Sequence, residues 1–208
     1  MVDFSFVASH PALDFVNTLV LDGGEERDRL DGFEDLLGWL TGSGLAKERW
    51  VAEARARWEG TPAAARVVEE ARSLRAHLRS AATALADGQA VPGLAVDALN
   101  ALLRRPVRTE ELILCDGGGD GPARWTRRVT REVAHPTDLL VPIAEAGADL
   151  LTAVDPTRIG RCGHPECIRF FLDTTKNRAR RWCETRTCGN RANVAAYHRR
   201  QRAGKGGR

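Results

Sequence analysis

The sequence predicts a mainly α-helical protein. A multihelical N-terminal domain with one small β-hairpin is followed by a metal-binding module of the treble-clef type, a second hairpin and a C-terminal helix. Apolar residues recur at helical spacing over most of the first 157 residues, four cysteines form two pairs near the C-terminus, and basic residues gather around those cysteines. We therefore expect domains over residues 1–156 and 157–202, and a disordered tail over 203–208.

The helices of the N-terminal part are predicted by apolar spacing and by boundary residues. Pro11 and Pro62 stand where a first turn tolerates proline, and Gly88 would end the longest helix. Asp31 and Glu34 have the spacing of a capping box ahead of the second helix. The apolar positions expected to face the core are Leu13, Val16, Val20, Phe33, Leu36, Leu37, Leu40, Trp50, Ala54, Trp58, Val67, Ala71, Leu74, Leu78, Ala81, Leu85, Leu99, Leu102 and Leu103.

A hairpin interrupts the helices near residue 115. The segments ELILCD (111–116) and ARWTRRV (123–129) flank a glycine-rich stretch, Gly117–Gly121, and predict two strands around a turn. Cys115, in the first of these strands, is interpreted as a small buried hydrophobic residue. A last helix is expected over Thr137–Val154, provided that Pro142 falls in its first turn.

Four cysteines, Cys162, Cys167, Cys183 and Cys188, have a spacing that suits one structural zinc ion. Each pair has four residues between its members, and fifteen residues separate the pairs. The first pair lies around a turn between two short strands, the second of them over Ile168–Leu172, and the second pair lies at the start of a helix. A segment with so few apolar side chains has little core of its own, so the metal would supply most of its folding free energy.

Disulfides or free thiols are the competing interpretation of the four cysteines. No apolar run is long enough to span a membrane, and the N-terminus lacks the pattern of a secretory signal, so we expect a cytoplasmic protein with no membrane partner. In that compartment a thiol cluster is more typical of a metal site. His164 lies between the first two cysteines, but four sulfurs already complete a tetrahedron, which favours a turn residue and argues against a catalytic metal.

Charge divides the chain into two unlike parts. Residues 158–208 carry a net charge of +11, whereas residues 1–157 carry −8. Such a basic module suits a polyanion, and guanidinium groups bind phosphates in bidentate fashion. The candidate nucleic-acid contacts are Lys176, Arg178, Arg180, Arg181, Arg191, Arg199, Arg200 and Arg202. The alternatives are a solvated face, docking of the module onto the acidic body, or support of the metal site by Arg181 and Arg191.

Residues 1–157 show no catalytic motif, and we expect a protein that is not an enzyme. Asn17 and Thr18 follow an apolar helix face, with Asp14 close by in the sequence. These three residues could line a ligand pocket, or they could cap or bridge neighbouring helices. The structural interpretation is the simpler of the two.

Two motifs resemble known families. Arg181-Trp182-Cys183, the segment FFLDTT at 170–175 and Cys188-Gly189-Asn190-Arg191 are similar to the CGNR zinc finger, with Thr174-Thr175 as a small departure. The segment ALDFVNTL at 12–19 resembles the start of the helical ABATE domain. The resemblance implies a bacterial stress-induced transcription regulator in which the finger binds DNA. The helical domain would serve for sensing an unknown effector or for homodimer formation. An RNA- or protein-binding module with a purely structural zinc is the alternative.

Overall fold

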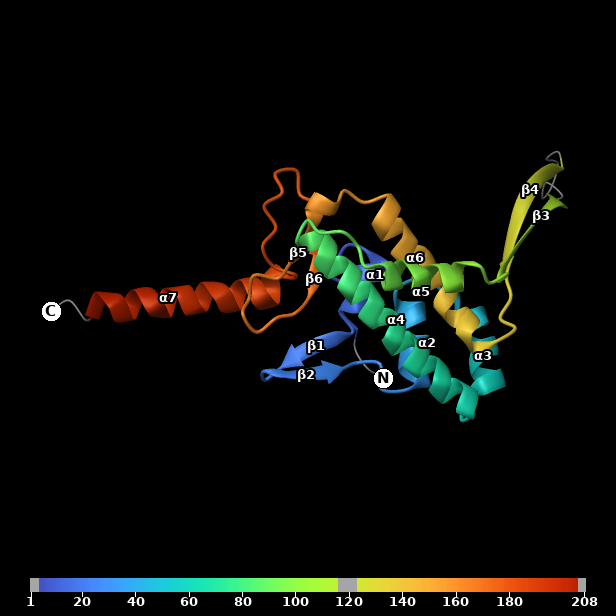
Figure 1. The fold of residues 1–208 in the computed structure, drawn as a ribbon, viewed down its shortest axis with the longest axis horizontal. Coiled ribbons are helices and arrows are strands. Elements are labelled where there is room, and N and C mark those ends of the chain that lie inside the picture. The colour runs from blue at the N-terminus through green and yellow to red at the C-terminus, as the bar shows by residue number, and fades with distance from the viewer. Residues whose placement is uncertain (1–3, 116–122, 206–208) are drawn as a thin grey trace.

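The computed structural model describes residues 4–115 and 123–205, and side chains as far as residue 197. The N-terminal part is a group of helices around the long central helix α4 (Figure 1). Its helices are α1 (Pro11–Val16), α2 (Phe33–Gly42), α3 (Glu48–Trp58), α4 (Pro62–Ala86), α5 (Gly93–Leu103), the 3₁₀ helix η1 (Pro136–Leu140) and α6 (Val141–Thr152). Helix α4 contacts α1, α2, α5 and η1, so its apolar stripe forms the middle of the core.

The central helix begins and ends as its sequence predicts. The Thr61 hydroxyl accepts a hydrogen bond from the Ala64 amide at 3.2 Å, Pro62 occupies the first turn, and Gly88 takes a positive φ of 65° after the helix. Its predicted apolar residues are buried, except Leu85, which is partly buried. Between α1 and α2, the rings of Phe15 and Trp39 meet edge to face, with their centroids 4.9 Å apart.

Two expected helix boundaries were wrong. The last helix begins at Val141, because Pro142 lacks an N–H and is accepted only in a first turn; the preceding residues form η1. Ahead of α2, Asp31 and Glu34 do not form a capping box. Instead the Asp35 carboxylate accepts hydrogen bonds from the Asp31 and Gly32 amides at 3.1 and 3.0 Å.

The expected first helix is also too long, because a hairpin was missed. Helix α1 ends at Val16, and strands β1 (Leu19–Asp22) and β2 (Glu25–Asp28) follow, with Leu19 opposite Asp28. Val20 is buried from this strand, not from a helix. Gly23 and Gly24 both have positive φ, 64° and 90°, as a two-residue hairpin turn requires.

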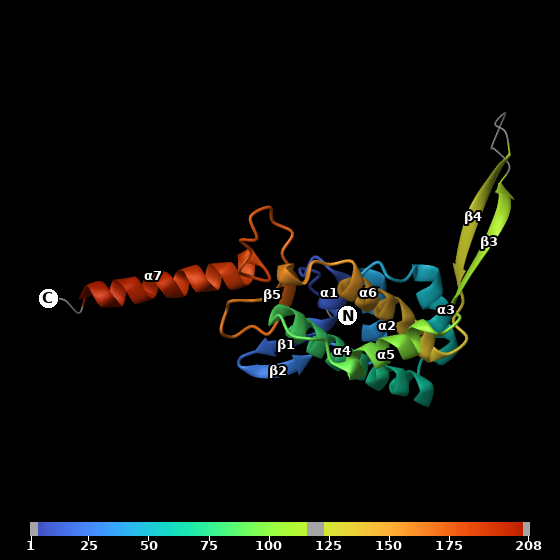
Figure 2. The same cartoon turned by 45° about the horizontal axis from the view of Figure 1, so that its top comes forward.

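The predicted hairpin near residue 115 is present and projects from the helices (Figures 1 and 2). Strands β3 (Arg108–Cys115) and β4 (Arg124–Arg131) are antiparallel, with Leu114 opposite Trp125. The glycine-rich turn, Gly117–Gly121, lies outside the described residues. Cys115 is exposed, which corrects the expectation of a buried residue: a lone two-stranded ribbon has no layer beneath it.

The C-terminal part contains a small hairpin and one long helix. The 3₁₀ helix η2 (Pro156–Arg158) leads into β5 (Ile159–Arg161), which pairs with β6 (Phe170–Leu172); β6 is shorter than the expected strand. A π-helical turn (Thr185–Gly189) then leads into α7 (Asn190–Lys205), which extends away from the rest of the molecule (Figures 1 and 2). Helix α7 includes 203–205, which were expected to be disordered; residues 206–208 lie outside the described part.

Within the described part of the chain, no helix is both long and apolar enough to cross a membrane.

Candidate metal centre and the surfaces around it

The four cysteine sulfurs meet at one point of the structure. The ligand atoms of Cys162, Cys167, Cys183 and Cys188 all lie within 4.8 Å of one another. The Cys183 sulfur is 3.7 Å from that of Cys167 and 3.6 Å from that of Cys188. Zinc–sulfur bonds of about 2.3 Å in a regular tetrahedron place the sulfurs about 3.8 Å apart. The four cysteines therefore form the site of one structural zinc ion.

Four clustered thiols bind zinc as thiolates, and their mutual contacts disfavour ionisation while no metal is bound. Hydrogen bonding to Cys162 raises the pKa of Cys167 to about 11, and the shared hydrogen bonds with Cys162 and Cys167 raise the pKa of Cys183 as well. Four thiolates confined in this space would repel one another, and zinc relieves that repulsion by binding them. His164 is not part of the cluster: its Nδ1 accepts a hydrogen bond from the Glu166 amide within the turn.

The residues between and after the cysteines pack around the metal site. Trp182 is partly buried and packs against the cluster of buried cysteines. A Cβ at Gly163 would lie 3.2 Å from the indole ring, and a Cβ at Gly189 would lie 3.2 Å from its other side. Asn190 donates from its side-chain amide to the Arg186 carbonyl at 3.0 Å. Glycine and asparagine at these positions therefore serve packing and the start of α7, while Arg191 is exposed to solvent.

Arg180 is one of the candidate nucleic-acid contacts, but its guanidinium is occupied by hydrogen bonds within the protein. Its guanidinium donates to the carbonyls of Leu172, Trp182, Cys183 and Val7, and to the Ser9 hydroxyl. The same group lies over the Phe171 ring, 4.6 Å from its centroid. Arg180 thus joins the metal-binding module to the N-terminal segment, which is the docking alternative that the charge distribution left open.

Asn17 makes a second connection between the two parts. Its side chain is buried, donates to the Phe170 carbonyl and accepts from the Phe170 amide, both at 2.8 Å. The Asn17 amide thus pairs with the backbone N–H and C=O of Phe170, as the backbone of a neighbouring strand would. Arg79 of α4 adds a bond to the Ile168 carbonyl at 2.8 Å. The module is therefore docked onto α1 and α4 rather than tethered by a flexible linker.

The remaining candidates between the cysteine pairs are on the surface. Arg178 has a positive φ of 51° and pairs with Asp155 at 3.0 Å, and Arg181 lies over the Trp182 ring at 5.4 Å. Lys176 is exposed. Asp173 is held by Thr175 and by the Arg180 amide, not by Arg181 or Arg191.

The last candidates belong to α7. Arg191 lies in its first turn, and Arg199, Arg200 and Arg202 follow on the same helix, although their side chains lie outside the described part. Their backbone places them beyond the docked region, on the segment that extends away from the body (Figure 1).

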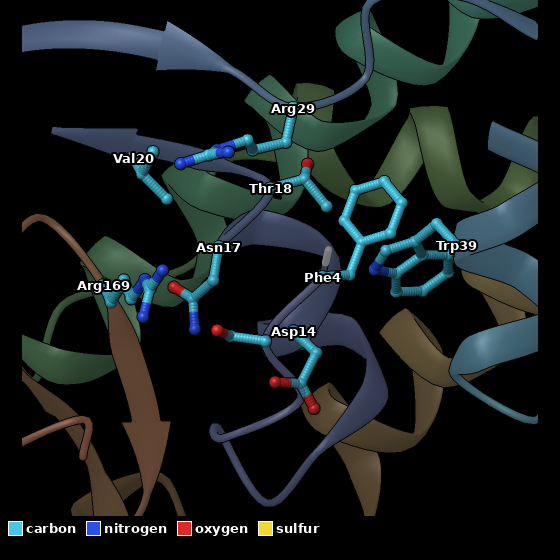
Figure 3. Close-up of a pocket in the computed structure, with 9 residues that line it drawn as sticks. Phe4, Asp14, Asn17, Thr18, Val20, Arg29, Trp39 and Arg169 are labelled. Carbon is cyan, nitrogen blue, oxygen red and sulfur yellow. The ribbon is translucent and has the colours of Figure 1, made fainter. Parts of the chain in front are cut away.

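Asp14, Asn17 and Thr18 are brought together, and each has an internal partner. Thr18 donates to the Phe15 carbonyl and accepts from Arg75 at 2.9 Å, while Asp14 accepts from the Ala8 amide at 2.8 Å. Burial raises the pKa of Asp14 to about 6. All three residues also border one pocket (Figure 3). The three residues therefore have a structural role in bridging their neighbours and also line a pocket.

Two residues of that pocket, Arg29 and Arg169, could not be selected from the sequence. They stand 140 positions apart in a chain with many arginines, and no local pattern distinguishes them. The docking contacts of Arg180 were equally hidden, because their acceptors are backbone carbonyls of distant segments.

Comparison with known proteins agrees with the two resemblances. Residues 9–154 match the family ABATE, described as "putative stress-induced transcription regulator", and residues 158–201 match the CGNR zinc finger. A search of curated proteins finds no match.

Proposed function

Because the chain belongs to the ABATE family and ends in a CGNR zinc finger, we propose that it is a transcription regulator that binds duplex DNA through this finger. In this proposal α7 enters the major groove, while the helical part senses a signal or forms a dimer. The zinc ion organises the finger and takes no part in catalysis. A cytoplasmic location belongs to the same proposal.

The single observation that carries the proposal is the contrast between the two sides of the finger. The hairpin side is bound to the acidic body through Asn17, Arg79 and Arg180. Helix α7 leaves from the opposite side, and its sixteen residues span about 24 Å at about 1.5 Å per residue. A helix of that length can lie in the major groove, which is about 12 Å wide.

Charge supports the same orientation. The acidic residues of the finger, Glu166, Asp173 and Glu184, all precede α7, whose sequence after Asn190 contains only basic and neutral residues. Phosphate neutralisation by arginine supplies much of the affinity of such a helix for DNA. Of the eight candidate residues, Arg180 is not part of the proposed interface, because its guanidinium is occupied.

The test is fluorescence anisotropy of labelled duplex DNA with the zinc-loaded full chain at several salt concentrations. We expect affinity to fall steeply between about 50 and 200 mM salt, because binding releases about 0.9 counterions per neutralised phosphate. The triple variant R191Q/R199Q/R202Q should weaken binding and lower the salt slope by about 1 for each phosphate that is no longer neutralised. R66Q, an exposed arginine on α4, is the matched control and should bind as the wild type does.

Binding that is absent, independent of salt or unchanged in the triple variant would contradict the proposal. A competition arm separates the alternative: if single-stranded or structured RNA displaces the duplex at equal or lower concentration, the finger is an RNA-binding module instead.

A further inference from the structure

A pocket lies where the finger meets the helical body, and nothing in the proposed DNA interface uses it. Its volume is about 250 Å³. Asn17, Thr18 and Trp39 border it from the body, and Arg169 borders it from the finger (Figure 3). Ligand pockets for drug-sized molecules measure about 300–1,000 Å³, so this one suits a smaller molecule.

Two arginines of the pocket, Arg29 and Arg169, form no side-chain hydrogen bond with the residues that the structure describes. Both are half-buried, and in the described part of the chain neither guanidinium forms a side-chain hydrogen bond or an ion pair. Nearby arginines behave differently: Arg75 pairs with Asp28, and Arg79 and Arg180 donate to backbone carbonyls. Asp14 interacts electrostatically with Arg169, but the lining holds two arginines and one acidic residue, so an anion would complete the charge balance of this site.

Both arginines border the same pocket. In Figure 3 the Arg29 side chain extends toward Val20 and Arg169 lies beside Asn17, with the Asp14 carboxylate on the other side of Asn17. Asp14 is the acidic residue of the lining and is already hydrogen-bonded to the Ala8 amide. Two positive charges against one negative charge leave the pocket positive near neutral pH. Guanidinium groups bind carboxylates and phosphates with paired hydrogen bonds.

The rest of the lining is apolar on one side. Phe4 and Trp39 lie together at the side of the pocket away from Arg169 (Figure 3), and Trp39 belongs to the hydrophobic core. Trp39 is almost completely buried, so the apolar surface open to a ligand on this side is that of Phe4, which an inorganic ion would leave uncovered. The lining therefore favours a molecule that has both an anionic group and an apolar part.

We propose that this pocket binds a small organic anion, whose carboxylate or phosphate binds Arg29 and Arg169 and whose apolar part contacts Phe4. Such a ligand touches the body through Arg29 and the finger through Arg169, next to the Asn17–Phe170 hydrogen bonds that dock β6. Its binding would therefore stabilise the docked finger. The site does not depend on whether the finger binds DNA.

The experiment is isothermal titration calorimetry, with thermal melting, on the zinc-loaded full chain. The probes are benzoate, phenyl phosphate and the uncharged benzamide, which share the apolar part and differ in the polar group. We expect at least one anion to bind with a Kd below about 1 mM and to raise Tm, because a ligand bound only by the folded state stabilises it. Benzamide should bind at least tenfold more weakly. Whichever of benzoate and phenyl phosphate binds more tightly shows whether the site prefers a carboxylate or a phosphate.

Single variants locate the site. R29Q and R169Q should each raise the Kd of the anion by about tenfold, which corresponds to the loss of one charge-assisted hydrogen bond of about 1.5 kcal/mol. R66Q, on the distant surface of α4, should leave the Kd unchanged. A zinc content of one per chain confirms that R169Q keeps a folded finger.

The proposal is overturned if neither anion binds with a Kd below about 1 mM, if benzamide binds as well as the anions, or if R66Q weakens binding as much as R29Q does. Should a variant fail to fold, amide chemical shifts of the wild type during the titration decide the matter. Shifts centred on Asn17, Thr18 and Phe170 support the pocket, and shifts centred elsewhere reject it.

Discussion

The helical part and the finger of this protein reach their folded states by different means. In the helical part, buried residues from α1, α2, α3, α4 and α6 pack into one apolar core. The finger has a cluster of only four buried residues, Cys162, Phe171, Cys183 and Cys188, with Trp182 packed against it. The comparison shows that zinc binding by the cysteines stabilises the finger, whereas burial of apolar side chains stabilises the helices.

The finger also depends on the helical part. Ile159 and Phe170 of its hairpin belong to the large core, and the Ala8 carbonyl accepts a hydrogen bond from the Leu172 amide at 2.8 Å. The finger is thus held by metal on one side and by its neighbour on the other. Each of the predictions below removes one of these supports, beginning with the largest effect.

Removing one zinc ligand should have the largest effect. In C183S the finger should lose zinc and its order, because metal binding in such modules is worth about 10–16 kcal/mol. Helices α1 to α6 keep their core, so far-UV circular dichroism should lose only the part of the helical signal that α7 contributes, while limited proteolysis cuts within 174–205. C115S is the control, because Cys115 is exposed and outside the cluster. Global unfolding of C183S would show that the helices need the finger.

Removing Arg180 should weaken the docking next. R180M leaves the carbonyls of Val7, Leu172 and Cys183 without their donor, and we expect a loss of about 3 kcal/mol in the free energy of unfolding. Urea denaturation of the zinc-loaded protein measures it. R186M, at an exposed arginine of the same finger, should change stability by less than about 0.5 kcal/mol. Equal losses in both variants would refute the assigned role of Arg180.

Removing Asn17 should have a smaller and more local effect. N17A eliminates both hydrogen bonds to Phe170, and we expect a loss of about 2 kcal/mol. Hydrogen exchange of the Phe170 amide should accelerate, because its acceptor is gone, while amides of the α4 interior stay protected. N193A, on the exposed surface of α7, should leave both quantities unchanged. Unchanged exchange at Phe170 in N17A would place the docking elsewhere.

Asp14 should give the smallest effect, visible as a pH dependence. Its pKa is raised by burial from 3.8 to about 6, so the folded state holds this proton more tightly than the unfolded state. Stability from this group is therefore fully present below about pH 4 and is lost as pH rises through about 6. Between pH 5 and 7 the wild type should lose about 1 kcal/mol relative to D14N, measured by urea denaturation. A constant difference would contradict the raised pKa.

The sequence predicted those features that depend on local spacing. The cysteine pattern identified all four ligands, because metal geometry restricts which spacings work. The helices α2 to α5 followed from apolar periodicity. Gly23 and Gly24 do carry a hairpin signal, but Leu13, Val16 and Val20 also fit a helical face, and that pattern concealed the short strands.

Features that depend on distant segments were beyond sequence reasoning. Arg180 resembles its basic neighbours in the sequence, and only the fold places the Val7 carbonyl beside its guanidinium. Arg29 and Arg169 become a pair only after docking. Cys115 was expected to be buried because a free cysteine behaves as a small hydrophobic residue, yet its hairpin projects from the helices.

The central claim is that zinc orders the surface that binds DNA, whereas the helical part stays folded without zinc. The most direct test titrates zinc into the metal-free protein and measures duplex DNA affinity at each step. We predict that affinity rises in proportion to added zinc and saturates at one equivalent per chain, while the far-UV helical signal rises only by the contribution of α7. Metal-free protein that binds DNA as tightly as the zinc-loaded form would contradict the account.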